Sequence, residues 1–166
     1  GYVDYRATWG LGRVDLLKGL CGDASAIDDA LLQYGSVVDT FANIDEPFDD
    51  LVDMAVSAYA ESGTIRFLQH QGYVQIEKSA KKNQEQNALQ VALENFEAAL
   101  NLSNKSNTAE SKKYIDTMLP LYLQALCIDS QPERLQQVAN EFHLSSSNLA
   151  ELNSMIDQTQ WKECIK

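Results

Sequence analysis

The chain has 166 residues, of which 45% are hydrophobic, and its formal net charge is −11. This length fits one domain with at most a small appendage, and three prolines and eight glycines are few for a β-sandwich or a disordered tail. So acidic a surface repels nucleic-acid phosphates and anionic membranes, and no apolar run reaches the ~18 residues that a membrane span needs.

The hydrophobic pattern predicts a first helix over residues 5–21. Ala7, Leu11, Val14 and Cys21 form its apolar face, and three further leucines widen this face: Leu16, Leu17 and Leu20.

A second, clearly amphipathic helix is predicted over 25–43. A third is predicted over 47–70 and begins at Pro47, since proline is typical of the first helical position. The negative charge gathers here, because ten residues between Gly19 and Ile65 are Asp or Glu and none is Lys or Arg. This segment is either a solvated helix surface or a docking face for a basic partner.

Residues 79–87 are polar without an apolar stripe and are predicted to be a loop or an exposed helical extension. A fourth helix is predicted over 86–102, where Ala92, Phe96 and Ala99 lie on one stripe. Small residues let a second helix approach closely, and the ring fills the gap between them. This stripe therefore predicts a helix that packs between other helices.

The Ala92, Phe96 and Ala99 stripe resembles the second helix of a tetratricopeptide (TPR) repeat. Gly12 and Gly19 resemble the glycines of a first TPR helix, which permit close helix contact and end the helix. The resemblance covers residues 7–103, and the repeats are stretched relative to the standard length of about 34 residues. It implies an all-α fold, an irregular TPR-like α-solenoid of stacked helical hairpins with about seven helices.

A fifth helix is predicted over 108–128, with Pro120 expected to kink or split it near Met118. Two shorter helices are expected over 131–142 and 146–157. We expect two regions, a helical stack over residues 1–129 and a C-terminal helix pair over residues 130–166.

The segment 135–153 resembles a helix-turn-helix unit and also the helix pair of a LysM carbohydrate-binding module. Its second helix carries no basic residue, and the segment before it is predicted to be helical where a LysM module has a strand. We therefore interpret it as a plain packed helix pair and predict no nucleic-acid binding.

The residues that could carry catalysis are few and scattered. Cys21, Cys127 and Cys164 are an odd set without close spacing, which predicts reduced thiols rather than a disulfide framework or a zinc site. His70 and His143 have no neighbour typical of a metal ligand, and a Cys127/His143 nucleophile pair has no supporting motif. We predict no enzyme, no cofactor and no metal site. The compartment stays open: a cytoplasmic protein is slightly favoured, and a periplasmic one follows if a signal peptide was removed before Gly1.

The predicted function is that of a protein-interaction module, an adaptor, assembly or co-chaperone-like domain. It would bind a protein or peptide of basic character on a concave helical face. The alternative is a helical module for a small molecule or glycan, and the oligomeric state is not predicted. Aromatic rings either line this face or form the core, and they are Tyr34, Tyr59, Phe96, Tyr114 and Tyr122. The residues predicted to bind the partner are Tyr34, Tyr59, Asp45, Asp49, Asp50 and Asp53.

Overall fold

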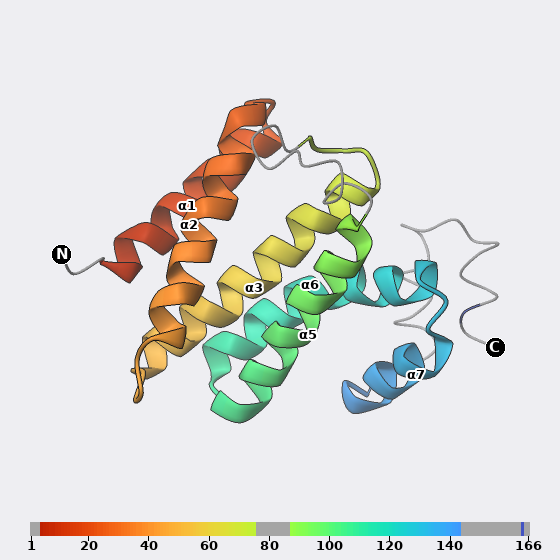
Figure 1. Ribbon diagram of the computed structural model, residues 1–166. Helices are drawn as coiled ribbons and strands as arrows, with labels where there is room; N and C mark the ends of the chain where they lie inside the picture. Colours follow the sequence, from red (N-terminus) through yellow and green to blue (C-terminus); the bar gives the residue numbers. More distant parts are fainter. Residues whose placement is uncertain (1–3, 76–86, 144–163, 165–166) are drawn as a thin grey trace. The chain divides into compact units, whose positions relative to one another are not determined.

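The computed structural model describes residues 4–75, 87–143 and 164, and these residues form an all-helical structure (Figure 1). Six helices are described: α1 (Tyr5–Leu20), α2 (Ala24–Ala42), α3 (Asp49–His70), α5 (Ala88–Ser106), α6 (Ala109–Ile128) and α7 (Pro132–Glu141). The predicted all-α class is confirmed for this part of the chain. The helix predicted over 146–157, the loop over 79–86 and the second half of the 135–153 pattern lie outside the described residues.

Short polar residues begin and end several helices. The side chain of Asp4 accepts hydrogen bonds from the first-turn amides of α1, at 3.0 Å from the nitrogen of Arg6. Asn107 ends α5 in the left-handed conformation, with φ of 53°. Thr108 follows at once and accepts from the amide of Ser111 at 3.2 Å, which caps α6. The predicted bounds of α1 and α6 are close to the observed ones, whereas α5 ends at Ser106, four residues later than predicted.

The chain divides into two compact units, residues 1–118 and 119–166. The helix α6 continues from one unit into the other, and Pro120 lies inside it. Of the two effects predicted for Pro120, splitting of the helix is wrong, because α6 is unbroken from Ala109 to Ile128.

The N-terminal unit contains two helical hairpins, α1 with α2 and α3 with α5. In each hairpin a glycine of the first helix faces an aromatic ring of the second. A Cβ atom added to Gly12 would lie 2.8 Å from Cε1 of Tyr34, and one added to Gly63 would lie 2.7 Å from Cδ1 of Phe96. Both rings are fully buried. The close contact predicted at Gly12 is thus confirmed, and Gly63 repeats it in the next hairpin.

Most of the apolar face predicted for α1 points to solvent, contrary to the expectation from its periodicity, although Leu16 is half-buried against the core. Leu11 is 54% exposed and Leu17 is 64% exposed, whereas only Tyr5 and Gly12 of this helix are buried. The reason is that the glycine side of α1 faces α2, where Gly12 and Gly19 leave room for the side chains of Tyr34 and Ile27. Gly19 does not end the helix, which continues to Leu20.

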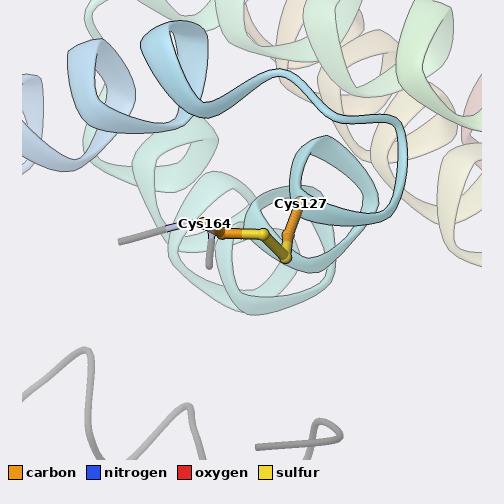
Figure 2. Close-up of a disulfide and its surroundings, with 2 residues drawn as sticks. All are labelled: Cys127 and Cys164. Carbon is orange, nitrogen blue, oxygen red and sulfur yellow. A yellow bond between two sulfur atoms is a disulfide. The ribbon is translucent and has the colours of Figure 1, made fainter. Parts of the chain in front are cut away.

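The C-terminal unit is held by a disulfide between Cys127 of α6 and Cys164 (Figure 2). Their Cα atoms are 5.5 Å apart, and Cys127 is buried at the end of α6. The prediction of reduced thiols is therefore wrong for this pair, because folding brings together two cysteines that are 37 positions apart in the sequence. Cys21 is a free, exposed thiol.

Among the described residues, none of the helices has the length and the apolar character that crossing a membrane requires.

Candidate functional site: a polar hollow between α1, α3 and α6

Three polar contacts join α1 to α3 along one face of the N-terminal unit. The hydroxyl of Tyr5 donates to Oδ1 of Asp50 at 3.1 Å, and the indole nitrogen of Trp9 donates to Oγ of Ser57 at 2.9 Å. One turn further along α1, Nε of Arg13 lies 3.3 Å from Oε1 of Glu61. The residues on α1 are four positions apart, which places them on one side of the helix. This face of α3 is therefore polar, although the helix also contributes many buried apolar residues.

Glu61 is the centre of the network. Its two carboxylate oxygens have different partners, since Arg13 pairs with Oε1 and the hydroxyl of Tyr34 donates to Oε2. The side chain of Glu61 is only 18% exposed. Burial raises its pKa, and the hydrogen bond from Tyr34 and the charge of Arg13 act in the opposite direction. Burial, followed by the neighbouring Glu61 charge, also raises the pKa of Tyr34, so this hydroxyl stays protonated and remains a donor.

A hollow of about 210 Å³ opens beside Glu61. Three helices, α1, α3 and α6, contribute the residues that line it. The lining residues are Arg13 of α1, Ala60, Glu61 and Thr64 of α3, and Glu110, Lys113, Tyr114, Thr117 and Met118 of α6. All of them belong to the N-terminal unit.

Contacts at both ends fix the walls of the hollow. The ring of Tyr114 on α6 meets Trp9 of α1 edge to face, with centroids 6.4 Å apart and planes at 71°. At the start of α6, the hydroxyl of Thr108 donates to Asp53 of α3. Thr108 thus caps α6 and ties it to α3 with the same hydroxyl group. The lining residues are held on packed helices rather than on loops.

The charges of the lining are balanced. Nζ of Lys113 lies 3.3 Å from Oε2 of Glu110, and both side chains are well exposed. The guanidinium of Arg13 lies 5.2 Å above the centre of the Trp9 ring. The hollow thus offers exposed cations, carboxylates and hydroxyls around apolar atoms of Ala60 and Met118. Such a lining can hold one or two side chains of a peptide and hydrogen-bond its polar groups.

The lining does not contain a metal or nucleophile arrangement. No histidine or cysteine lines this hollow. In the part of the chain that the structure describes, no group of three or more His, Cys, Asp and Glu side chains is placed to hold a metal ion. The sulfur of Cys127, considered above as a nucleophile, is bound to Cys164.

The predicted partner-binding residues are distributed over several places. Tyr34 is fully buried and reaches the hollow only through its hydrogen bond to Glu61. Tyr59 is half-buried, and burial followed by the nearby charge of Asp39 raises its pKa. Because residues two apart on a helix are about 200° apart, Tyr59 is on nearly the opposite side of α3 from Glu61.

The four predicted aspartates fall into two pairs. Asp45 and Asp49 are exposed, the first in the turn before α3 and the second at its start. Asp50 and Asp53 are engaged in contacts within the chain, and Asp50 accepts from Tyr5 and pairs with Arg6. Asp53 accepts from Thr108 of the α5–α6 turn. Asp50 and Asp53 therefore join α3 to α1 and to the start of α6.

Of the five aromatic rings considered, only Tyr114 lines the hollow, while Tyr34, Phe96 and Tyr122 are fully buried. Sequence reasoning missed Arg13, Lys113 and Glu110. A signal for the site exists on α3, where Ser57, Glu61 and Thr64 follow one another at helical spacing among buried apolar residues. Sequence alone does not pair this polar stripe with residues more than forty positions away on α1 and α6.

A larger hollow, of about 440 Å³, lies in the C-terminal unit and is lined by Ser130–Arg134 and Gln137. Among the described residues, this lining comes from one turn and the beginning of α7 alone. The hollow beside Glu61 is the stronger candidate because three helices converge there.

The chain matches no known family model, and neither curated proteins nor solved structures give a significant match.

Proposed function

We propose that this chain is a protein-interaction module, built of irregular TPR-like helical hairpins, that binds a segment of a partner protein in the hollow between α1, α3 and α6. The repeated contact of a glycine with a ring, at Gly12 and Gly63, supports the comparison with stacked helical hairpins.

The observation that carries the proposal is the make-up of the hollow. Its volume of about 210 Å³ is below the 300–1,000 Å³ of typical small-molecule pockets, and its rim is charged. A site of this size and polarity fits one or two side chains of an extended segment better than an enclosed ligand. We therefore rank the small-molecule or glycan alternative second.

The exposed acidic residues outside the hollow support a partner of basic character. Asp45, Glu46 and Asp49 are all exposed around the turn before α3. Charges of this kind speed the encounter with an oppositely charged partner more than they strengthen the final complex. They would steer a basic segment toward the module, while Glu61 and Glu110 offer acceptors for its amino or guanidinium groups.

The disulfide supports a location in an oxidising compartment, because such bonds persist in secreted and periplasmic proteins and are rare in the cytosol. This reverses the slight preference for the cytoplasm that the cysteine spacing suggested.

The test uses a peptide selected from a random displayed library by the wild-type chain, with affinity measured by calorimetry. Lys113→Glu changes a residue of the hollow, and Lys112→Glu is a matched control, since Lys112 is an exposed neighbour that does not line it. Because the partner is basic, a carboxylate in place of the Lys113 cation should strengthen binding. A charge-assisted hydrogen bond is worth about 1.5–3 kcal/mol, so we expect Lys113→Glu to raise affinity about tenfold or more and Lys112→Glu to change it little. Equal effects of the two variants, or failure to select any peptide, would refute the proposed site.

The steering role is tested separately by the double variant Asp45→Lys with Asp49→Lys. We expect a slower association rate and a weaker dependence of that rate on salt, whereas Glu94→Lys on α5, also exposed, should change neither as much. Asp50 and Asp53 are left unchanged, because their substitution would disturb the contacts of α3 with α1 and Thr108.

A further inference from the structure

Both carboxylates of the hollow beside Glu61 are paired with cations of the chain itself. Oε1 of Glu61 lies 3.3 Å from Nε of Arg13, and Oε2 of Glu110 lies 3.3 Å from Nζ of Lys113. All four residues line the hollow. A basic side chain of a partner therefore finds a cation already beside each carboxylate and has to compete with it.

Of the two carboxylates, Glu61 is the better-fixed acceptor. Its side chain is 18% exposed, whereas that of Glu110 is 51% exposed. The hydroxyl of the buried Tyr34 donates to Oε2 of Glu61 and holds the carboxylate from the inner side. A carboxylate that is oriented in this way and shielded from water forms a stronger hydrogen bond with a cation than an exposed one does. Glu61 is therefore the acceptor that a basic side chain gains most from reaching.

Arg13 holds Glu61 loosely. Its Nε contact of 3.3 Å is longer than the ~2.7–2.9 Å of a strong charge-assisted hydrogen bond, and its side chain is 47% exposed. The guanidinium also lies 5.2 Å above the centre of the Trp9 ring, a contact that does not depend on Glu61. Because an ion pair with so exposed a member contributes little to stability, Arg13 can leave Glu61 and stay against the ring at a small cost.

We infer that Arg13 is a built-in competitor of the partner: it occupies Glu61 in the free protein, and a basic side chain of the partner takes its place there on binding. This inference rests on the proposed peptide site and names the contact that the partner must break. Arg13 lowers the affinity, because the energy of the displaced ion pair is subtracted from that of the new one. It also sharpens specificity, because a neutral side chain gains too little from Glu61 to displace a guanidinium.

The chain contains a matched reference for Arg13. Arg6, seven residues earlier on α1, pairs with Asp50 of α3 with Nη2 and Oδ2 2.5 Å apart, and its guanidinium lies 4.9 Å above the ring of Tyr5. Arg6 is not among the residues that line the hollow. The variants Arg6→Gln and Arg13→Gln thus remove the same charge, an ion pair with α3 and a ring contact from the same helix. A difference between them in peptide binding reports the place of Arg13 at Glu61.

The first test measures, by calorimetry at physiological salt, how tightly the two variants bind the peptide that the wild-type chain selects from a displayed library. A partly exposed ion pair is worth at most about fivefold in an equilibrium constant, so we expect Arg13→Gln to bind about three- to fivefold more tightly than the wild type. Arg6→Gln should bind like the wild type. Equal affinities of the two variants, or weaker binding by Arg13→Gln, would overturn the inference. The peptide site itself still stands in that case if Lys113→Glu and Lys112→Glu differ, whereas failure to select any peptide overturns both.

The second test follows the Arg13 side chain in the wild type, so it does not depend on how well Arg13→Gln folds. In nitrogen-15 labelled protein each arginine gives an Nε–Hε signal in the NMR spectrum, and Arg13→Lys, which keeps the charge, identifies the signal of Arg13 by its loss. Saturating peptide should move this signal toward the position of arginine in an unfolded chain and leave the Arg6 signal in place. An Arg13 signal that keeps its position in the complex would overturn the inference, because the ion pair with Glu61 would then persist beside the bound peptide.

Discussion

Adding a single methyl group at Gly63 tests the close approach of α3 and α5. In Gly63→Ala the new Cβ would lie 2.7 Å from both Cδ1 and Cε1 of Phe96 and 3.2 Å from the carbonyl oxygen of Ala92. Phe96 is fully buried, so its ring has no free space to enter, and the Ala92 carbonyl belongs to the backbone of α5. Overpacking of a core typically costs about 1–3 kcal/mol. Replacing glycine by alanine within a helix returns up to ~1 kcal/mol. With the full propensity gain, we therefore expect a net loss of up to about 2 kcal/mol in the free energy of unfolding.

The control is Gly10→Ala, which makes the same chemical change in helix α1. No atom lies within 4 Å of a Cβ built at Gly10, so this variant should gain about 0.5–1 kcal/mol from helix propensity alone. Urea unfolding followed by far-ultraviolet circular dichroism compares the two variants with the wild type. A smaller ring should relieve the clash, so Phe96→Leu is expected to cost less in the Gly63→Ala background than in the wild type. If Gly63→Ala is as stable as Gly10→Ala, the close contact between α3 and α5 is not present.

Two further predictions concern the disulfide and the buried carboxylate. Cys127→Ser removes the bond that closes a loop of about 38 residues, and a chain-entropy model gives this bond a stabilisation of about 4 kcal/mol. Reduction should destabilise the wild type to a similar extent and leave the stability of Cys127→Ser unchanged. A wild type whose stability does not change on reduction would contradict the pairing. Because burial raises the pKa of Glu61, the folded protein holds this proton to higher pH than the unfolded chain does. Its contribution to stability is thus complete below the ordinary value of 4.5 and is lost as the pH rises through the raised value. Glu61→Gln should lack this loss in urea titrations between pH 4 and 7, and a parallel pH dependence in both proteins would argue against a buried, perturbed Glu61.

The helical class and most helix boundaries follow from local features of the sequence. Apolar residues at helical spacing, Asp4 before α1 and the polar turn around Asn107 act over a few residues, so they can be read without knowing the fold. The close approach at Gly12 was also predictable, because a glycine within a helical pattern leaves space that a ring can fill.

The tertiary structure decided which face of each helix is buried. Periodicity on α1 identifies an apolar face, yet the glycine face packs inside, since the fit of Gly12 to Tyr34 and Gly19 to Ile27 depends on a second helix. The contacts of Asp50 and Asp53 within the chain have the same cause, because their partners Tyr5, Arg6 and Thr108 are 44 or more positions away in the sequence.

The candidate site was also decided by the tertiary structure alone. Arg13, Glu61 and Tyr114 are spread over about one hundred residues and share no motif, and they meet only because α1, α3 and α6 pack together. The disulfide is similar, because the spacing of the cysteines contains no information about which sulfur atoms the folded chain brings into contact. Short-range geometry therefore determined the helices, whereas packing between helices determined the charged hollow, the cross-link and the exposed apolar face of α1.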